Sequence, residues 1–244
     1  MQFDTIIQNG EVVTADGTFR ADVAIRDGKV VCMAEHLEGA EHIIDATGKL
    51  VMPGGIDIHT HLDTPLNGSY TLDDWYQGTV SAACGGVTCV VDYPKQEVGH
   101  SVRDIIEKWK EKAGGKAVID YSFSPVITQY TEEVYAEIPE LIREGFPGYK
   151  VFMAYWHRIS DADLVRMLDV VSRNGGILGV HCENDWAADY MIGKLLAEGK
   201  TAPKYFPMSR PPVIEEDATS RAIKLAQMVD ANLLIVHMSC KGAL

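Results

Sequence analysis

The sequence lacks the features of a membrane-bound, secreted or nucleic-acid-binding protein. It has no apolar run that approaches the length of a membrane span. Its first residues, MQFDTIIQNG, lack the basic start and long apolar stretch of a secretory signal. Basic residues are also few, since 22 Lys and Arg stand against 35 Asp and Glu and the net charge is −13. Such a charge repels nucleic acid and anionic membranes, so we expect neither as a partner and predict a cytoplasmic protein.

Cysteine is scarce and scattered, and no Cys-x-x-Cys pair occurs. The five cysteines are Cys32, Cys84, Cys89, Cys182 and Cys240. Their odd number and wide spacing indicate neither a disulfide framework nor a structural zinc site made of cysteines. We expect them to be small buried apolar residues in a reducing compartment.

Residues 1–50 have the pattern of a small β-domain. Short apolar or β-branched runs are separated by the turn pairs Asn9-Gly10, Asp16-Gly17 and Asp27-Gly28. No helical period is present. We predict a small antiparallel sheet, the N-terminal part of a β-sandwich domain.

From residue 51 the pattern changes to apolar runs that alternate with amphipathic segments. The predicted strands are residues 51–58, 87–92, 117–123, 149–154, 176–181 and 233–237. The predicted helices are residues 73–84, 101–114, 131–145, 160–174, 185–199 and 215–230. This alternation predicts an α/β domain over 51–244 with a parallel sheet. Six such units fit a doubly wound sheet, or an eight-unit barrel short of two units. Because the sequence stops just after the sixth strand, we expect a fragment.

Four histidines and one lysine gather at the predicted strands. His59 and His61 end the first strand, His181 ends the fifth and His237 ends the sixth, while Lys150 begins the fourth. Residues two apart on a strand face the same side, so His59 and His61 reach into the same space. The carboxyl ends of parallel strands form one active face. Because imidazole is a preferred ligand of zinc, this face is a candidate metal site.

Lys150 lies in GYKVFMAY, among apolar and aromatic neighbours. Its stem can lie along the sheet while the ammonium reaches water. Alternatively the amine is buried and neutral, because desolvation lowers the pKa of a lysine. A neutral amine can take up carbon dioxide and become a carbamate, whose two oxygens can bridge a pair of metal ions.

The segments GGIDIHTHLD, GYKVFMAY, GVHCEND and IVHMS, in this order, resemble the amidohydrolase superfamily, and within it the cyclic amidohydrolases of the dihydropyrimidinase and hydantoinase family. The resemblance covers the whole chain. It implies a (β/α)8 TIM-like barrel, here truncated after the sixth strand, beside a small β-sandwich. It also implies two divalent ions, with zinc expected, bridged by carboxylated Lys150. His59 and His61 would bind the more buried ion, and His181 and His237 the second.

The same resemblance assigns a substrate and a catalytic tyrosine. It implies hydrolysis of a cyclic amide, a dihydropyrimidine or a 5-substituted hydantoin, to an N-carbamoyl amino acid. Tyr155 would bind the substrate carbonyl and stabilise its oxyanion. The segment 62–72 would shape the pocket for the exocyclic substituent, and Phe152 and Trp156 would add to its wall or simply pack in the core. The family's metal-binding aspartate falls beyond Leu244, so we expect residues 1–244 alone to be inactive and a full-length protein to be a homotetramer or dimer.

Three other classes of protein in this superfamily are considered. A dihydroorotase would have an arginine for the substrate carboxylate where Asp63 stands, and an aspartate repels that group. An allantoinase shares the metal ligands but generally lacks the tyrosine, so Tyr155 favours dihydropyrimidine or hydantoin rings. A non-catalytic scaffold of this family, or a truncated remnant, would have lost metal ligands, whereas all five are intact here.

Overall fold

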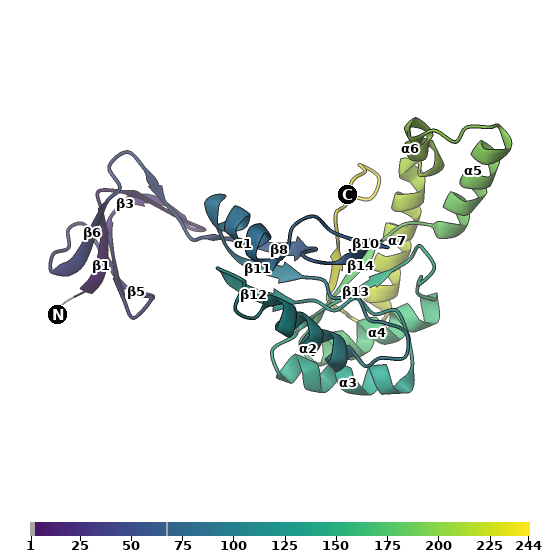
Figure 1. Ribbon diagram of the computed structural model, residues 1–244, viewed down its shortest axis with the longest axis horizontal. Coiled ribbons are helices and arrows are strands. Elements are labelled where there is room, and N and C mark those ends of the chain that lie inside the picture. Colours follow the sequence, from purple (N-terminus) through teal and green to yellow (C-terminus); the bar gives the residue numbers. More distant parts are fainter. Residues whose placement is uncertain (1–2, 67) are drawn as a thin grey trace. The chain divides into compact units, whose positions relative to one another are not determined.

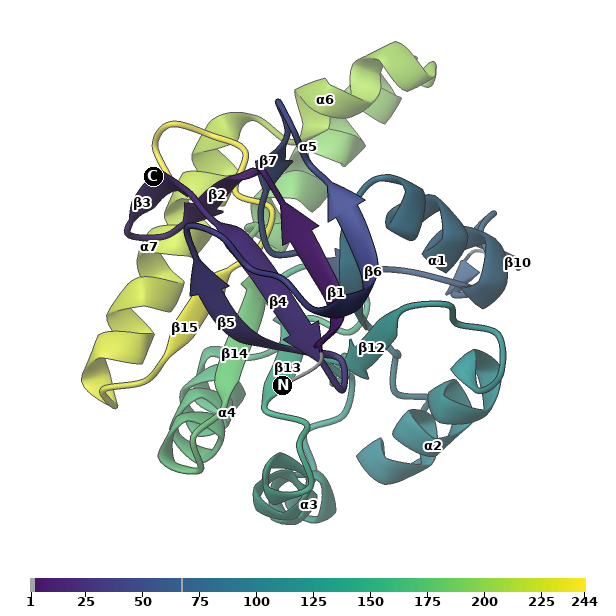
Figure 2. The ribbon, with the colours of Figure 1, turned by 90° about the vertical axis from the view of Figure 1, so that its left-hand side faces the viewer.

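The computed structural model describes residues 3–66 and 68–244, and the chain divides into two compact units, Met1–Gly55 and Ile56–Leu244. The smaller unit contains two sheets. Its four-stranded sheet has the order β5-β4-β1-β6 (Figure 2), from β1 (Phe3–Gln8), β4 (Asp22–Arg26), β5 (Lys29–Ala34) and β6 (Ala40–Asp45). Its three-stranded sheet has the order β3-β2-β7, from β2 (Glu11–Thr14), β3 (Gly17–Arg20) and β7 (Leu50–Val51).

The turn residues of the smaller unit act as predicted, but its sheets are mixed. Asp27 and Gly28 adopt positive φ of 51° and 70° between β4 and β5, the geometry of a tight hairpin. The prediction of a purely antiparallel sheet was wrong, because β1 pairs with β6 and β2 with β7 in parallel. Two-residue turns join only antiparallel neighbours, and these parallel pairs join segments far apart in the sequence.

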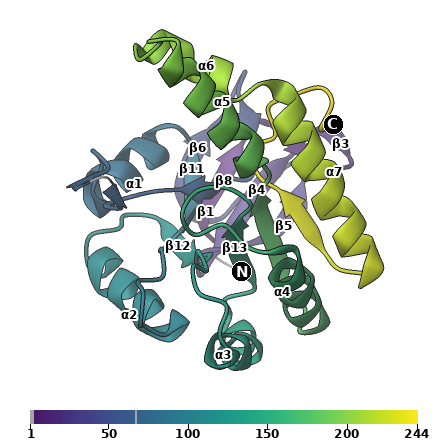
Figure 3. The ribbon, with the colours of Figure 1, turned by 90° about the vertical axis from the view of Figure 1, so that its right-hand side faces the viewer.

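The larger unit alternates strands and helices, as predicted. Its main strands are β8 (Gly55–Thr60), β11 (Val87–Asp92), β12 (Asp120–Phe123), β13 (Gly148–Phe152), β14 (Ile177–His181) and β15 (Leu233–Ile235). Its main helices are α1 (Trp75–Cys84), α2 (Val102–Ala113), α3 (Glu132–Arg143), α4 (Asp161–Arg173), α5 (Asp185–Ala197) and α7 (Pro212–Met228). Figure 3 shows α1 to α4 and α7 arranged around the outside of the strands.

The strands of the larger unit form two three-stranded sheets, ordered β12-β11-β8 and β13-β14-β15. Parallel pairing joins β11 to β12, and β14 to both β13 and β15. Isolated parallel bridges from Lys95 to Val126 and from Val126 to Lys150 connect the two sheets. Across the described residues the strands do not close into a barrel.

One sequence prediction in this unit requires correction, and several short elements were not predicted. The first strand does not run over 51–58, because Pro53 and Gly54 separate β7 from β8; proline offers no N–H to a sheet ladder. The segment 200–214 contains a 3₁₀ turn (Pro203–Tyr205) and α6 (Phe206–Ser209), which the sequence did not indicate, and a short hairpin of β9 (Pro65–Leu66) and β10 (Ser69–Tyr70) follows β8. Figure 1 shows α6 close to α5.

Helices α2, α3 and α4 each bury one apolar face in the core. In α2, the buried residues Val102, Ile105, Ile106, Trp109 and Ala113 recur with helical spacing. Ser160 caps α4 by accepting a hydrogen bond from the N–H of Asp163, as predicted, and Gly175 follows the helix with a φ of 83°. The five cysteines are free; Cys182 is buried as expected, whereas Cys84 is exposed. None of the described helices combines the length and apolarity needed to cross a membrane.

A buried carboxylate, Asp92 at the end of β11, ties the core to the loop after β8. Its Oδ1 accepts hydrogen bonds from Leu62 N (2.8 Å) and Thr60 Oγ1 (3.0 Å), and its Oδ2 accepts one from Trp109 Nε1 (2.8 Å). The side chain is fully shielded from solvent. Burial raises the pKa of Asp92 from 3.8 to about 6, although these hydrogen bonds lower it.

This raised pKa predicts a pH-dependent stability. Between pH 3.8 and about 6 the unfolded chain loses the Asp92 proton while the folded chain keeps it, so the contribution of Asp92 to stability falls as pH rises, by about 3 kcal/mol in all. Burial lowers the pKa of His59 and of His237 to about 4, so these residues act in the opposite direction over the same range. In Asp92→Asn the contribution of Asp92 should disappear, so the stability of the wild type relative to the variant should fall between pH 4 and 6. The variant should also lose roughly 1–3 kcal/mol at pH 7, because an amide N–H then faces a hydrogen-bond donor.

Denaturant unfolding at pH 4, 5, 6 and 7 measures both effects. The exposed Asp120, on the neighbouring strand β12, provides the matched control Asp120→Asn, which should leave the pH profile unchanged. A difference in free energy of unfolding between the wild type and Asp92→Asn that stays constant from pH 4 to 6 would contradict the assignment.

Candidate metal centre and active site

The structure places the four predicted histidines at the ends of three strands. His59 is the next-to-last residue of β8, and His61 follows that strand directly. His181 is the last residue of β14, and His237 lies two residues beyond β15. His237 has a φ of 37°, a left-handed conformation that non-glycine residues rarely adopt. Such strain is found most often where a side chain must be aimed at a site.

The four imidazoles form a continuous cluster. Ring centroids are 5.2 Å apart between His61 and His59, 5.4 Å between His59 and His237, and 4.9 Å between His237 and His181. His181 Nδ1 lies 3.3 Å from His237 Nε2. Tyr93, directly after β11, stacks on His59 with the centroids 4.2 Å apart. The strand ends thus bring all four predicted histidines together.

Lys150 lies in the middle of β13 and is 1 % exposed. Its ammonium nitrogen has no hydrogen-bond partner; it lies over two aromatic rings, 4.8 Å from the centroid of Phe152 and 5.5 Å from that of Tyr93. Burial lowers the pKa of Lys150 to about 7. A substantial fraction of the amine is therefore neutral at pH 7. Because the residue is buried, the amine does not extend to solvent, which was the other possibility considered from the sequence.

Lys150 is also electrostatically coupled to the histidines. Burial, followed by the charge of Lys150, lowers the pKa of His59 and of His237 to about 4 and lowers that of His61 as well. These imidazoles are therefore neutral at pH 7, the form that binds metal ions. The lysine and the histidines belong to one site.

The donor set fits a pair of divalent ions when Lys150 is counted with the histidines. Within the described residues, no three His, Cys, Asp or Glu side chains converge well enough to hold an ion by themselves. The histidines instead form two pairs, and Lys150 is buried beside them without a partner. A carbamate on Lys150 would add one oxygen to each pair, which gives each ion three protein ligands, the usual number in catalytic zinc sites.

Tyr155 lies beside the second histidine pair. Its ring centroid is 5.3 Å from that of His181, and the residue is 39 % exposed. Its φ of 70° is held by the buried Asp185 at the start of α5, which accepts a hydrogen bond from Tyr155 N (3.0 Å). Asp185 is fixed in turn by Arg158 Nη1, at 2.5 Å. The loop therefore aims this tyrosine through a strained backbone that tertiary contacts maintain.

A cavity of about 560 Å³ opens beside these groups. It is lined by His61, Thr64, Pro65, Leu66, Thr71, Tyr93, Lys95, Val126, Phe152, Tyr155, Trp156 and His157. Four residues of the segment 62–72, together with Phe152 and Trp156, thus lie around a single cavity with Tyr155, as the sequence suggested, while Asn67 of that segment lies outside the described residues. His181 and His237 line a separate, smaller hollow of about 90 Å³.

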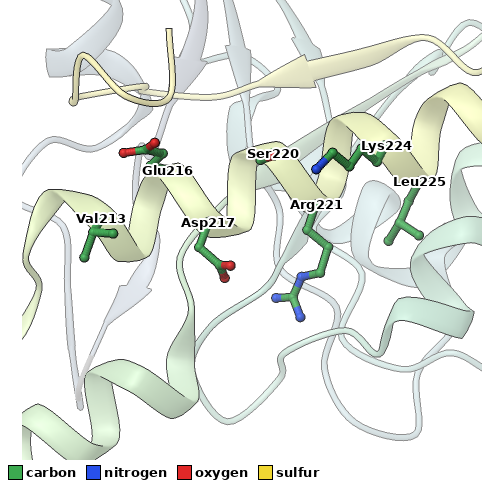
Figure 4. A pocket seen from close by; sticks show the side chains of 7 residues that line it. All are labelled: Val213, Glu216, Asp217, Ser220, Arg221, Lys224 and Leu225. Carbon is green, nitrogen blue, oxygen red and sulfur yellow. The ribbon is translucent and has the colours of Figure 1, made fainter.

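Another hollow, on α7, has no part in this arrangement. It lies along one helix, whose side chains Val213, Glu216, Asp217, Ser220, Arg221, Lys224 and Leu225 are shown in Figure 4. None of these is one of the strand-end residues. The candidate catalytic and metal-binding residues therefore lie away from this hollow, at the strand ends and around Tyr155.

Sequence reasoning missed several residues of the site. Asp92 was detectable, because it is a carboxylate at the end of a predicted strand. Tyr93, Lys95 and His157 had no such signal, since they lie in loops whose neighbours are set by tertiary pairing. Glu183, 3.5 Å from His181 Nε2 and 3.3 Å from Arg210, was also not singled out.

Comparison with known proteins shows which enzymes the chain resembles. Residues 42–113 match the model of the amidohydrolase family. The chain is 45 % identical to a D-hydantoinase of Ralstonia pickettii over 243 residues, which cover 99 % of this chain and 53 % of that protein. A solved D-hydantoinase structure superposes with a TM-score of 0.94 at 45 % identity, over 98 % of this chain and 53 % of the other. A dihydropyrimidinase from Brevibacillus agri gives 0.94 at 43 %, with the same coverage.

Over nearly its whole length the chain is similar to hydantoinases and dihydropyrimidinases, as the sequence motifs indicated, and its residues 42–113 carry the match to the amidohydrolase family. The chain spans about half the length of the relatives that it matches.

Proposed function

We propose that the protein is a metal-dependent hydrolase that opens cyclic amide rings. Dihydropyrimidines or 5-substituted hydantoins would be converted to N-carbamoyl amino acids. The observation that carries this proposal is Lys150, a fully buried amine with no hydrogen-bond partner beside two pairs of histidines. The high identity to D-hydantoinases supports it. We further propose that the six main strands of the larger unit are part of a (β/α)8 barrel, and that the protein is cytoplasmic and homo-oligomeric.

We assign the residues of this chain to the following roles in metal binding and catalysis. His59 and His61 would hold one divalent ion and His181 and His237 another, with carboxylated Lys150 between them and zinc the expected metal. Such ions polarise a carbonyl and activate a water. Tyr155 would bind the ring carbonyl and stabilise the oxyanion. The walls formed by Leu66, Phe152 and Trp156 would exclude water and hold the exocyclic substituent.

Metal content and ring opening test the proposal together. The full-length protein, supplied with zinc and bicarbonate, should bind two ions and convert dihydrouracil or a 5-substituted hydantoin to the N-carbamoyl product. The double variant His59→Ala/His61→Ala should lose at least one ion by elemental analysis, and hydrolysis with it. The matched control His36→Ala/His42→Ala removes two exposed histidines of the smaller unit and should retain both ions.

Two results would change the assignment. Unchanged metal content in His59→Ala/His61→Ala would refute the proposed ligands. Faster hydrolysis of allantoin than of either other ring would instead identify an allantoinase-type enzyme, the second candidate, whose metal ligands are the same.

A further inference from the structure

The cavity beside Tyr155 has a charge opposite to that of the whole chain. The protein has a net charge of −13, yet none of the described residues that line this cavity is Asp or Glu. Its ionisable or imidazole-bearing lining residues, apart from the tyrosines, are His61, Lys95 and His157. His61 belongs to the proposed metal site. Lys95 and His157 therefore have no role in the proposed metal binding or ring opening.

Lys95 is held in the wall by its backbone. It follows β11 by three residues, and its backbone forms a parallel bridge with Val126. The next residue, Gln96, is 2 % exposed and accepts a hydrogen bond from Thr128 N through its side-chain oxygen (3.1 Å). This stretch is consequently fixed by contacts between strands, and Lys95 is placed at a defined point of the cavity.

The amine of Lys95 has no counter-ion. No carboxylate among the described residues forms an ion pair with it, whereas Lys112, for example, pairs with Asp63 (3.2 Å). The Lys95 ammonium nitrogen lies over the face of Trp156, 4.8 Å from the ring centroid. A half-buried ammonium over an aromatic ring is partly desolvated, so an anion beside it gains more than it would in water.

His157 adds an unused hydrogen-bonding group to the same wall. The residue is 7 % exposed, and neither of its ring nitrogens has a hydrogen-bond partner. It packs edge-on against Phe152 and Trp156, with centroids 4.9 Å and 4.7 Å away. Buried polar groups without a partner are rare and costly in folded proteins, unless a ligand completes them.

We propose that Lys95 binds a carboxylate on the exocyclic substituent of the ring substrate, with His157 as a neighbouring donor. The inference rests on the proposed function, because it names the substrate class of that same cavity. The protein would therefore prefer a ring that bears an acidic side chain to its neutral isostere. Asp63 does not oppose this, since it pairs with Lys112 and does not line the cavity.

Two isosteric ligands test the preference: 5-(2-carboxyethyl)hydantoin and 5-(2-carbamoylethyl)hydantoin. In calorimetric titrations at low salt the wild type should bind the acid about tenfold more tightly than the amide, the effect of one charge-assisted hydrogen bond at a half-exposed site. Lys95→Met keeps the length of the side chain and should remove this preference while changing the affinity for the amide less than about twofold. Lys95→Arg should retain it.

The control variant Lys116→Met removes the same charge from an exposed position of the same unit and should keep the wild-type preference. Equal affinity of the wild type for acid and amide, or binding of neither, would overturn the inference. An equal loss of both affinities in Lys95→Met, with an unchanged melting temperature, would show that Lys95 only packs against Trp156.

The same samples separate this inference from the proposed function. Opening of neutral rings without a preference for the acid would refute the role of Lys95 and leave the hydrolase intact. A preference for the acid in binding, without hydrolysis of any ring, would refute the hydrolase and leave the carboxylate site intact.

Discussion

Lys150→Met is expected to leave the protein with no more than one bound metal ion and without measurable ring opening. Methionine fills the volume of the fully buried lysine stem but offers no nitrogen for carbon dioxide, so the two histidine pairs lose their common ligand. Lys150→Ala should have the same effect, and because it leaves space beside the histidines, acetate should partly restore activity by supplying the missing oxygens. Elemental analysis of each variant, with and without acetate, measures these changes.

A stability measurement on metal-free protein separates loss of ligation from misfolding. Removing a buried, unpaired amine relieves a desolvation cost, so metal-free Lys150→Met should unfold at a denaturant concentration no lower than the metal-free wild type does. Loss of metal in a stable variant then points to ligation rather than to misfolding. Full retention of two ions by stable Lys150→Met would show that the lysine does not bridge them.

Tyr155→Phe is expected to reduce turnover by roughly 10²–10³, with little change in KM, because an oxyanion donor acts mainly in the transition state. The ring itself is kept, so its contacts with Phe152 and His181 should persist. The matched control, Tyr190→Phe, removes the hydroxyl of a tyrosine on α5 that is 73 % exposed.

Steady-state kinetics of both variants on one ring substrate separate the hydroxyl's role from general effects. Tyr190→Phe should match the wild type. Turnover by Tyr155→Phe within a factor of two of the wild type would exclude the hydroxyl from the reaction, and an effect confined to KM would make Tyr155 a binding residue only.

The histidines and Lys150 were predictable because their positions follow from local pattern. Strand residues alternate between faces, and parallel strands end at the same edge, so His59, His61, His181 and His237 had to converge once the strands were assigned. The apolar neighbours of Lys150 likewise indicated burial. Helices α2, α3 and α4 were predicted to within a few residues for the same reason, since each has a clear apolar period and an N-cap, whereas the short α6 has no cap and was not predicted.

Other features depend on contacts between segments that are far apart in the sequence, so the local sequence pattern does not predict them. The positive φ of Tyr155 is maintained by a hydrogen bond to Asp185, which lies thirty residues further along the chain. Lys95 reaches the cavity only because its backbone pairs with Val126. The mixed sheets of the smaller unit have the same origin, because hairpin signals identify antiparallel neighbours but say nothing about which strand returns beside β1 or β2.

The buried carboxylate of Asp92 has a thermodynamic consequence for ion capture. It accepts hydrogen bonds from Thr60 and from Leu62, the residues on either side of His61, and is itself anchored to α2 through Trp109. The direction of His61 is thus set by the core before any ion arrives, and little chain entropy remains to be lost when one binds. Capture at this position should be a local event with a small heat-capacity change, in contrast to metal sites that form only as their chain folds around the ion.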